Sequence, residues 1–190
     1  MLGLPRGGVP VAYEVARALD VPLDVFLVRK LGAPGHEELA MGAIATGGIR
    51  VINEQVRSML RIPDDALARV AAREQEELER RERVYRGDAA APELRGRTVI
   101  VVDDGLATGS TMRAAAQALR VLEPRWLVVA VPVAAPETCD EFRDIVDDVV
   151  CVQTPERFQA VGLWYDDFSQ TSDDEVRALL REQRSHEGAA

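Results

Sequence analysis

Two adjacent carboxylates, Asp103 and Asp104, directly follow an apolar run in the segment VVDDGLATGST at 101–111. Neighbouring like charges repel one another and resist desolvation, so we expect a ligand or a metal ion to compensate for them. The small-residue loop that follows contains Gly109 and several hydroxyl side chains, and it leads into a helical pattern. Free N–H groups and the dipole at such a helix start favour an anion. The segment therefore predicts acceptors for hydroxyls or a metal beside a phosphate site, a combination that matches a ribose 5-phosphate.

Other phosphate-binding and catalytic loops do not fit these residues. A P-loop needs Gly-Lys-Ser/Thr, and the loop at 105–111 has no lysine. A dinucleotide-binding turn needs G-x-G-x-x-G, and a hydrolase elbow needs G-x-S-x-G. The loop has neither pattern, and it also lacks the D-x-D-G spacing of a HAD-like phosphatase. The remaining alternative is an ordinary strand-to-helix loop in which an aspartate caps the helix, although a cap needs only one carboxylate.

Short apolar runs rich in Val, Ile and Leu alternate with helical patterns along the chain. Continuous apolar runs suit strands covered on both faces, and strands alternating with helices produce a mostly parallel sheet. We therefore predict an α/β, Rossmann-like fold, with a mostly parallel five-stranded sheet flanked by helices in a single domain over 1–190. The predicted strands lie at 1–5, 22–28, 97–104, 125–133 and 146–152, and the predicted helices at 10–19, 64–86, 110–122 and 136–146, with a last helix after Ser172.

The ends of the chain and the long helix raise separate expectations. A buried strand starting at residue 1 would fray, so we expect the protein to have residues upstream of Met1. Ser172 and Glu175 have the spacing of a capping box before the last helix. The helix at 64–86 has an apolar stripe that thins towards its end. This pattern is typical of a solvated face, although a coiled-coil dimer seam remains an alternative.

The segment VIVVDDGLATGST at 99–111 resembles the phosphoribosyl pyrophosphate (PRPP) signature of type I phosphoribosyltransferases. The resemblance implies that Asp103 and Asp104 hold the ribose 2- and 3-hydroxyls together with Mg²⁺, and that 107–111 hold the 5-phosphate. Gly105 departs from the signature, because most members have an apolar residue there. With loop 4–8 added, the implied PRPP-binding residues are Arg6, Gly7, Asp103, Asp104, Ala107, Thr108, Gly109, Ser110 and Thr111.

Two further segments fit this resemblance. LPRGGV at 4–9 follows the first strand, where the family places its pyrophosphate loop, often with a strained or cis peptide. VRKLGAPGHEELAMGAIATGG at 28–48 resembles the flexible loop that closes over PRPP, so we expect a lid loop and hairpin over 28–54. Lys30 is the only lysine among 23 basic residues. We expect Arg29 and Lys30 to be catalytic, with Lys30 neutralising the leaving pyrophosphate; His36 is more simply an exposed loop residue.

The segment at 154–170 is the candidate acceptor pocket, within a predicted hood and C-terminal helix over 154–185. Phe158, Trp164 or Tyr165 could stack on a flat ring, and Asp166 or Asp167 could accept hydrogen bonds from it. Alternatively, these aromatic residues only pack the C-terminal segment onto the core.

With AVGLWYDDFSQ at 160–170 and LPRGGVPVA at 4–12, nearly the whole chain resembles a bacterial subgroup of these enzymes that has no settled substrate and usually carries an extra N-terminal segment. The resemblance implies a homodimeric, Mg²⁺-dependent transferase that moves ribose 5-phosphate from PRPP to a small-molecule acceptor such as a nucleobase. The alternative is a PRPP- or nucleotide-sensing regulator without turnover.

The charge and composition of the chain argue against several classes of binding partner. The net charge of −9 argues against general binding to nucleic acids or anionic membranes. No apolar run is long enough to span a bilayer, and no signal-peptide pattern is present. Cys139 and Cys151 lack zinc-site spacing, and two thiols in a chain without an export signal are expected to be reduced. These features predict a cytoplasmic protein.

Overall fold

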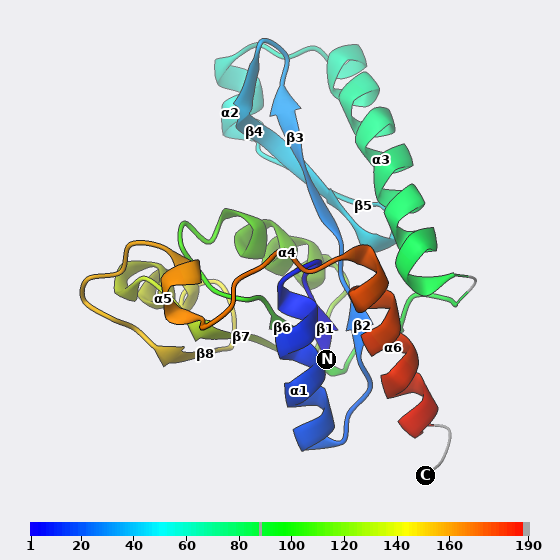
Figure 1. The fold of residues 1–190 in the computed structure, drawn as a ribbon. Helices are drawn as coiled ribbons and strands as arrows, with labels where there is room; N and C mark the ends of the chain where they lie inside the picture. The colour runs from blue at the N-terminus through cyan, green and yellow to red at the C-terminus, as the bar shows by residue number, and fades with distance from the viewer. Residues whose placement is uncertain (88, 188–190) are drawn as a thin grey trace.

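Five parallel strands form the central sheet in a computed structural model that describes residues 1–87 and 89–187 (Figure 1). Their order is β2-β1-β6-β7-β8, and every neighbouring pair is parallel. The predicted α/β fold with a five-stranded parallel sheet is confirmed. The strands are β1 (Leu2–Gly3), β2 (Asp24–Val25), β6 (Thr98–Val102), β7 (Trp126–Val133) and β8 (Asp148–Gln153).

Helices cover both faces of this sheet, and each face has its own apolar cluster. Alternate residues of β6 point to opposite faces, so Val101 joins one cluster while Val102 joins the other. The first cluster includes residues of α4 (Ser110–Val121) and α5 (Pro136–Phe142), and the second includes residues of α1 (Gly8–Leu19), α3 (Asp64–Arg86) and α6 (Asp173–Glu187). The carboxyl ends of the strands, where a ligand is expected, remain outside these layers.

A second sheet projects away from the first, with α3 running beside it (Figure 1). It is antiparallel in the order β3-β4-β5, and it contains the segment predicted as a lid loop and hairpin. Its strands are β3 (Val28–Ala33), β4 (His36–Ala45) and β5 (Ile49–Ile52), with the 3₁₀ turn η1 (Thr46–Gly48) between the last two and α2 (Glu54–Met59) after them. The run expected as one strand at 22–28 is divided between β2 and the start of β3.

The long helix α3 has the predicted bounds, and it uses its apolar stripe within the chain. Ala71, Leu78 and Tyr85 are buried where α3 packs on β3 and α6. The stripe is therefore not left exposed as a coiled-coil seam. The predicted capping box of α6 is also present, because Ser172 N donates to Glu175 Oε2 at 2.7 Å and Glu175 N donates to Ser172 Oγ at 3.2 Å. None of the described helices combines the length and apolar character that crossing a membrane requires.

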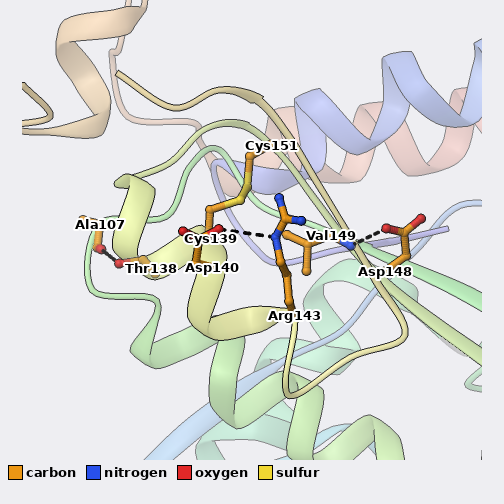
Figure 2. Close-up of a disulfide and its surroundings, with 8 residues drawn as sticks. All are labelled: Ala107, Thr138, Cys139, Asp140, Arg143, Asp148, Val149 and Cys151. Atoms are coloured by element: carbon orange, nitrogen blue, oxygen red, sulfur yellow. Dashed lines mark hydrogen bonds and ion pairs between the residues drawn. A yellow bond between two sulfur atoms is a disulfide. The ribbon is translucent and has the colours of Figure 1, made fainter. Parts of the chain in front are cut away.

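The prediction of two reduced thiols is wrong. Cys139 of α5 and Cys151 of β8 form a disulfide, with Cα atoms 6.7 Å apart (Figure 2). The two residues are separated by 12 positions, and α5 is the crossover between β7 and β8. This crossover returns Cys139 to the strand that carries Cys151. The sequence spacing alone does not show this return, since it depends on how the helix packs on the sheet.

Candidate functional site

The two carboxylates lie at the carboxyl end of β6, against the loop that follows β1. Loop 4–8 approaches so closely that a Cβ atom at Gly7 would overlap Asp104 Oδ2. A Cβ at Gly8 would lie 2.6 Å from the carbonyl oxygen of Val102. A side chain at Gly8 would overlap the backbone of β6 and the residue after it, and one at Gly7 would displace the Asp104 carboxylate, so glycine keeps both the loop and the carboxylate in place. The Pro5–Arg6 peptide in this loop is cis, as the resemblance implied.

Partial burial makes the carboxylate pair electrostatically unfavourable without a ligand. Desolvation, followed by the nearby charge of Asp104, raises the pKa of Asp103 to about 7, while the N–H of Asp104, which donates to Asp103 Oδ1 at 2.9 Å, opposes the shift. Burial also raises the pKa of Asp104. No ion pair joins either carboxylate to a basic side chain within 1–87 and 89–187. Hydroxyl donors or a cation from a ligand would relieve this cost.

Asp103 and Asp104 are suited to hold magnesium only when a substrate supplies further ligands to the ion. The described residues contain no group of three or more His, Cys, Asp or Glu side chains that could hold a metal ion. Magnesium commonly takes one or two protein carboxylates and fills its remaining positions with water and substrate phosphates. The uncompensated pair of Asp103 and Asp104 fits that mode of binding.

The loop after the carboxylates is shaped as an anion site and is supported by α5. Gly109 has a φ of 65° and immediately precedes α4, whose first N–H groups lack partners within the helix. A Cβ at Gly109 would lie 2.6 Å from the Phe142 ring, and Thr138 Oγ1 donates to the carbonyl of Ala107 at 2.7 Å. The turn therefore has the free backbone donors and the close support that the phosphate prediction for 107–111 requires.

Arg29 and Lys30 point to opposite faces of β3, because successive strand residues alternate. Lys30 Nζ donates to Ser110 Oγ at 2.8 Å, which places the ammonium at the anion loop. Lys30 and Ser110 also line a cavity of about 580 Å³ between the second sheet and α4, together with Thr108. The single lysine is thus brought to the site, in contact with the 107–111 loop.

Arg29 is held from behind by a buried carboxylate. Its Nε donates to Glu74 Oε2 at 2.6 Å and its terminal nitrogen lies 2.5 Å from the same oxygen. Glu74 of α3 is only 8% exposed, and its helical spacing places it on the same stripe as Ala71 and Leu78, but the sequence did not identify it as a site residue. Arg29 lines a small cavity together with Pro5 and Thr111, so it faces both loop 4–8 and the loop at 107–111.

A second large cavity lies on the other side of the carboxylates, under the segment predicted as a hood. It has a volume of about 510 Å³ and is lined by Arg6 and Gly7 of loop 4–8, Pro10 and Val11 of α1, Asp104, and six hood residues including Tyr165, Asp167 and Phe168. The Tyr165 hydroxyl donates to the carbonyl of Asp104 at 2.6 Å, and the Tyr165 and Phe168 ring centroids are 5.1 Å apart. Burial raises the pKa of Tyr165 to about 12, so this hydroxyl stays a donor at neutral pH.

The structure separates the predicted acceptor residues. Tyr165 lines the cavity, whereas Phe158, Trp164 and Asp166 do not. Phe168 takes the place expected for a second aromatic residue, and Asp167 the place of the carboxylate. The order of residues in this segment could not distinguish them, because the chain turns through the 3₁₀ helix η2 (Val161–Trp164) just before Tyr165.

Gly105, the departure from the signature, has a local reason. A Cβ at Gly105 would lie 2.7 Å from a methyl carbon of Val161 and 3.0 Å from the Val133 carbonyl. Val161 of η2 therefore occupies the space that an apolar side chain at position 105 would need. This contact joins the hood segment directly to the carboxylate loop.

Comparisons with known proteins agree on one family. The family model described as phosphoribosyl transferase domain matches residues 1–166. Two Mycobacterium tuberculosis proteins, "Putative phosphoribosyl transferase MT0597" of strain CDC 1551 and "Putative phosphoribosyl transferase Rv0571c" of strain H37Rv, are 49% identical over 181 residues. Each match covers 95% of this chain and 41% of the relative, so the chain spans about two-fifths of the length of the curated relatives it matches. The crystal structure of TT1426 from Thermus thermophilus is similar with a TM-score of 0.85 and 45% identity, covering 96% of this chain and 86% of that one.

Proposed function

The chain belongs to the phosphoribosyl transferase domain family, and we propose that it transfers the ribose 5-phosphate of PRPP to a small acceptor with release of pyrophosphate. One observation carries this proposal: two half-buried carboxylates, uncompensated by any described cation, lie between a glycine loop and a helix N-terminus. A phosphorylated pentose has hydroxyls that can bind the two carboxylates and a phosphate that can bind the helix N-terminus.

The sugar is held from two sides in this proposal. Asp103 and Asp104 accept hydrogen bonds from the ribose 2- and 3-hydroxyls, which replace the water that burial removed. The 5-phosphate lies on the backbone N–H groups of 107–111, with the Ser110 and Thr111 hydroxyls as further donors. The Lys30 ammonium, already bonded to Ser110, adds a positive charge there. Holding both ends fixes the anomeric carbon for displacement.

The leaving group lies on loop 4–8 and its cations. Arg6 and the N–H of Gly7 are the proposed pyrophosphate donors, and Arg29 faces the same loop from β3. Magnesium, held by Asp103 and Asp104 oxygens and by substrate phosphate, would supply further neutralisation of the pyrophosphate. The protein side needs no covalent nucleophile, because positioning and electrostatic stabilisation of a separating charge are sufficient for this class of displacement.

The acceptor enters from the 510 Å³ cavity. Tyr165 and Phe168 offer aromatic faces to a flat ring, and Asp167 offers an acceptor for a ring N–H. A heterocyclic base is the acceptor class that fits these groups best. A homodimer and a cytoplasmic location remain parts of this proposal that rest on the sequence and its resemblance.

Release of pyrophosphate is the direct test. The chain would be incubated with PRPP, Mg²⁺ and one nucleobase at a time, beside Asp104→Asn and, as a matched control, Asp144→Asn, an exposed aspartate outside both large cavities. We expect base-dependent release from the wild type and Asp144→Asn, and a loss of at least about a hundredfold in Asp104→Asn, in the range typical of losing one positioned electrostatic group. Tight PRPP binding without release from any base would instead indicate a sensor.

A further inference from the structure

A group of arginines lies beside loop 4–8, in a small cavity that shares Arg6 with the 510 Å³ cavity but has no other lining residue in common with the two large cavities. Arg6 of the loop, Arg80 and Arg81 of α3, and Asp173 of α6 line a cavity of about 160 Å³, together with Val84 and Tyr85. Arg81 and Tyr85 also line the small cavity that contains Pro5, Arg29 and Thr111. Arg81 therefore lies between Arg6 on one side of the loop and Arg29 on the other.

The charges of this cavity leave guanidinium nitrogens for a ligand. Glu77 pairs with both Arg80 and Arg81, at 2.7 and 2.8 Å. Arg81 donates to Glu77 through Nε, and its terminal nitrogens have no acceptor among residues 1–87 and 89–187. Asp173 accepts from the Tyr85 hydroxyl at 2.7 Å and lies 3.9 Å from Arg6. Three guanidiniums and one carboxylate line the cavity, and with Glu77 counted as the partner of Arg80 and Arg81 one net positive charge remains, a balance that favours an anion.

Ordinary surface pairing explains other arginines of α3 but not this arrangement. Arg69 pairs with Asp65 four residues away, with both side chains about 70% exposed, and neither lines a described cavity. Arg81 instead points towards the loop that follows β1, and it meets a residue of α6, which is about 90 positions away in the sequence. Three separate segments therefore converge on one small polar cavity.

We propose that this cavity binds the distal phosphoryl group of pyrophosphate, with the terminal nitrogens of Arg81 as its main donors and Arg6 as the link to loop 4–8. The inference rests on the proposed function, which places pyrophosphate on that loop. A guanidinium offers two parallel N–H donors to a phosphoryl group, and the fixed helix positions them without closure of the second sheet. None of the residues proposed to hold the ribose and its 5-phosphate, Asp103, Asp104 and 107–111, lines this cavity.

Calorimetry with inorganic pyrophosphate and, separately, ribose 5-phosphate tests the subsite. Arg81→Gln should bind pyrophosphate about tenfold more weakly, the typical loss of one charge-assisted hydrogen bond. Its affinity for ribose 5-phosphate should stay unchanged. Arg83→Gln is the matched control, because Arg83 is on the same helix and lines a different surface hollow with Gly47 and Glu79. Asp173→Asn should bind pyrophosphate more tightly, since it removes the one negative charge from the cavity wall.

The results of these measurements test the pyrophosphate subsite and the proposed function separately. Wild-type affinity for pyrophosphate in Arg81→Gln, an equal loss in Arg83→Gln, or no gain in Asp173→Asn would each overturn the subsite. If Asp104→Asn loses ribose 5-phosphate binding in the same series, the proposed function stands even when the subsite falls. If the wild type binds neither compound, the proposed function itself fails.

Discussion

The raised pKa of Asp103 predicts how the stability of the ligand-free protein changes with pH. In the unfolded chain this carboxyl has its ordinary pKa of 3.8, whereas burial raises it to about 7 in the folded protein. Between these values the folded state binds more protons than the unfolded state, so this group lowers stability as pH rises. The cost begins near pH 4 and is complete above about pH 7. Asp103→Asn removes the charge and can still accept the hydrogen bond from the Asp104 N–H.

The magnitude follows from the size of the shift. The shift from 3.8 to about 7 is roughly three pKa units, and each unit corresponds to about 1.4 kcal/mol. Asp103→Asn should therefore raise the free energy of unfolding by up to about 4 kcal/mol at pH 8, and by less than about 1 kcal/mol at pH 4. Urea unfolding of the ligand-free proteins at the two pH values measures both differences.

Asp147→Asn provides a control of opposite sign. A hydrogen bond from Arg120, together with one from the N–H of Leu127, lowers the pKa of Asp147. Its charged form therefore stabilises the fold above the unfolded pKa, and the substitution should cost stability at pH 8. If Asp103→Asn is also destabilised at pH 8, or if its gain in stability is the same at both pH values, the conclusion that the Asp103 carboxylate is desolvated and uncompensated is refuted.

Three other substitutions test separate contacts. Lys30→Ala should weaken ribose 5-phosphate binding about tenfold by calorimetry, because it removes the ammonium next to Ser110; a loss confined to turnover would place the lysine at the leaving group instead. Gly105→Ala should lower the free energy of unfolding by about 1–3 kcal/mol through overlap with Val161, and Val161→Ala in the same chain should restore most of it; no rescue would contradict this contact. Cys139→Ser should cost about 3 kcal/mol under non-reducing conditions, as expected for a bond that closes a loop of this length. Dithiothreitol should lower the wild type to the same level, and an oxidised wild type no more stable than the variant would contradict the bond.

Local patterns in the sequence were sufficient to predict the layers and the central motif. The strands and helices follow from apolar runs and helical spacing, and α3 has the predicted bounds of 64–86. Asp103 and Asp104 lie at the end of β6, because a carboxyl pair directly after a buried run has to be placed at that edge of the sheet. The resemblance suggested a strained or cis peptide in loop 4–8, whereas the close approach of Gly7 to Asp104 and of Gly8 to Val102 is seen only in the structure.

What the sequence could not show depends on contacts between distant segments. Glu74 supports Arg29 across 45 positions; its spacing places it on the same stripe of α3 as Ala71 and Leu78, but the sequence does not show which cation it meets. Phe168 lines the hood cavity and Trp164 does not, because the 3₁₀ turn before Tyr165 decides which aromatic residues face inward. The Cys139–Cys151 bond was missed for the same reason, since a crossover helix had to return to the sheet first.

A crystal structure of the chain grown with ribose 5-phosphate would show directly whether the two carboxylates and the glycine loop hold opposite ends of one sugar. We expect the phosphate on the backbone N–H groups of 107–111 and the 2- and 3-hydroxyls within hydrogen-bond distance of Asp103 and Asp104. The same sugar bound elsewhere, with both carboxylates contacting only protein atoms, would contradict this arrangement.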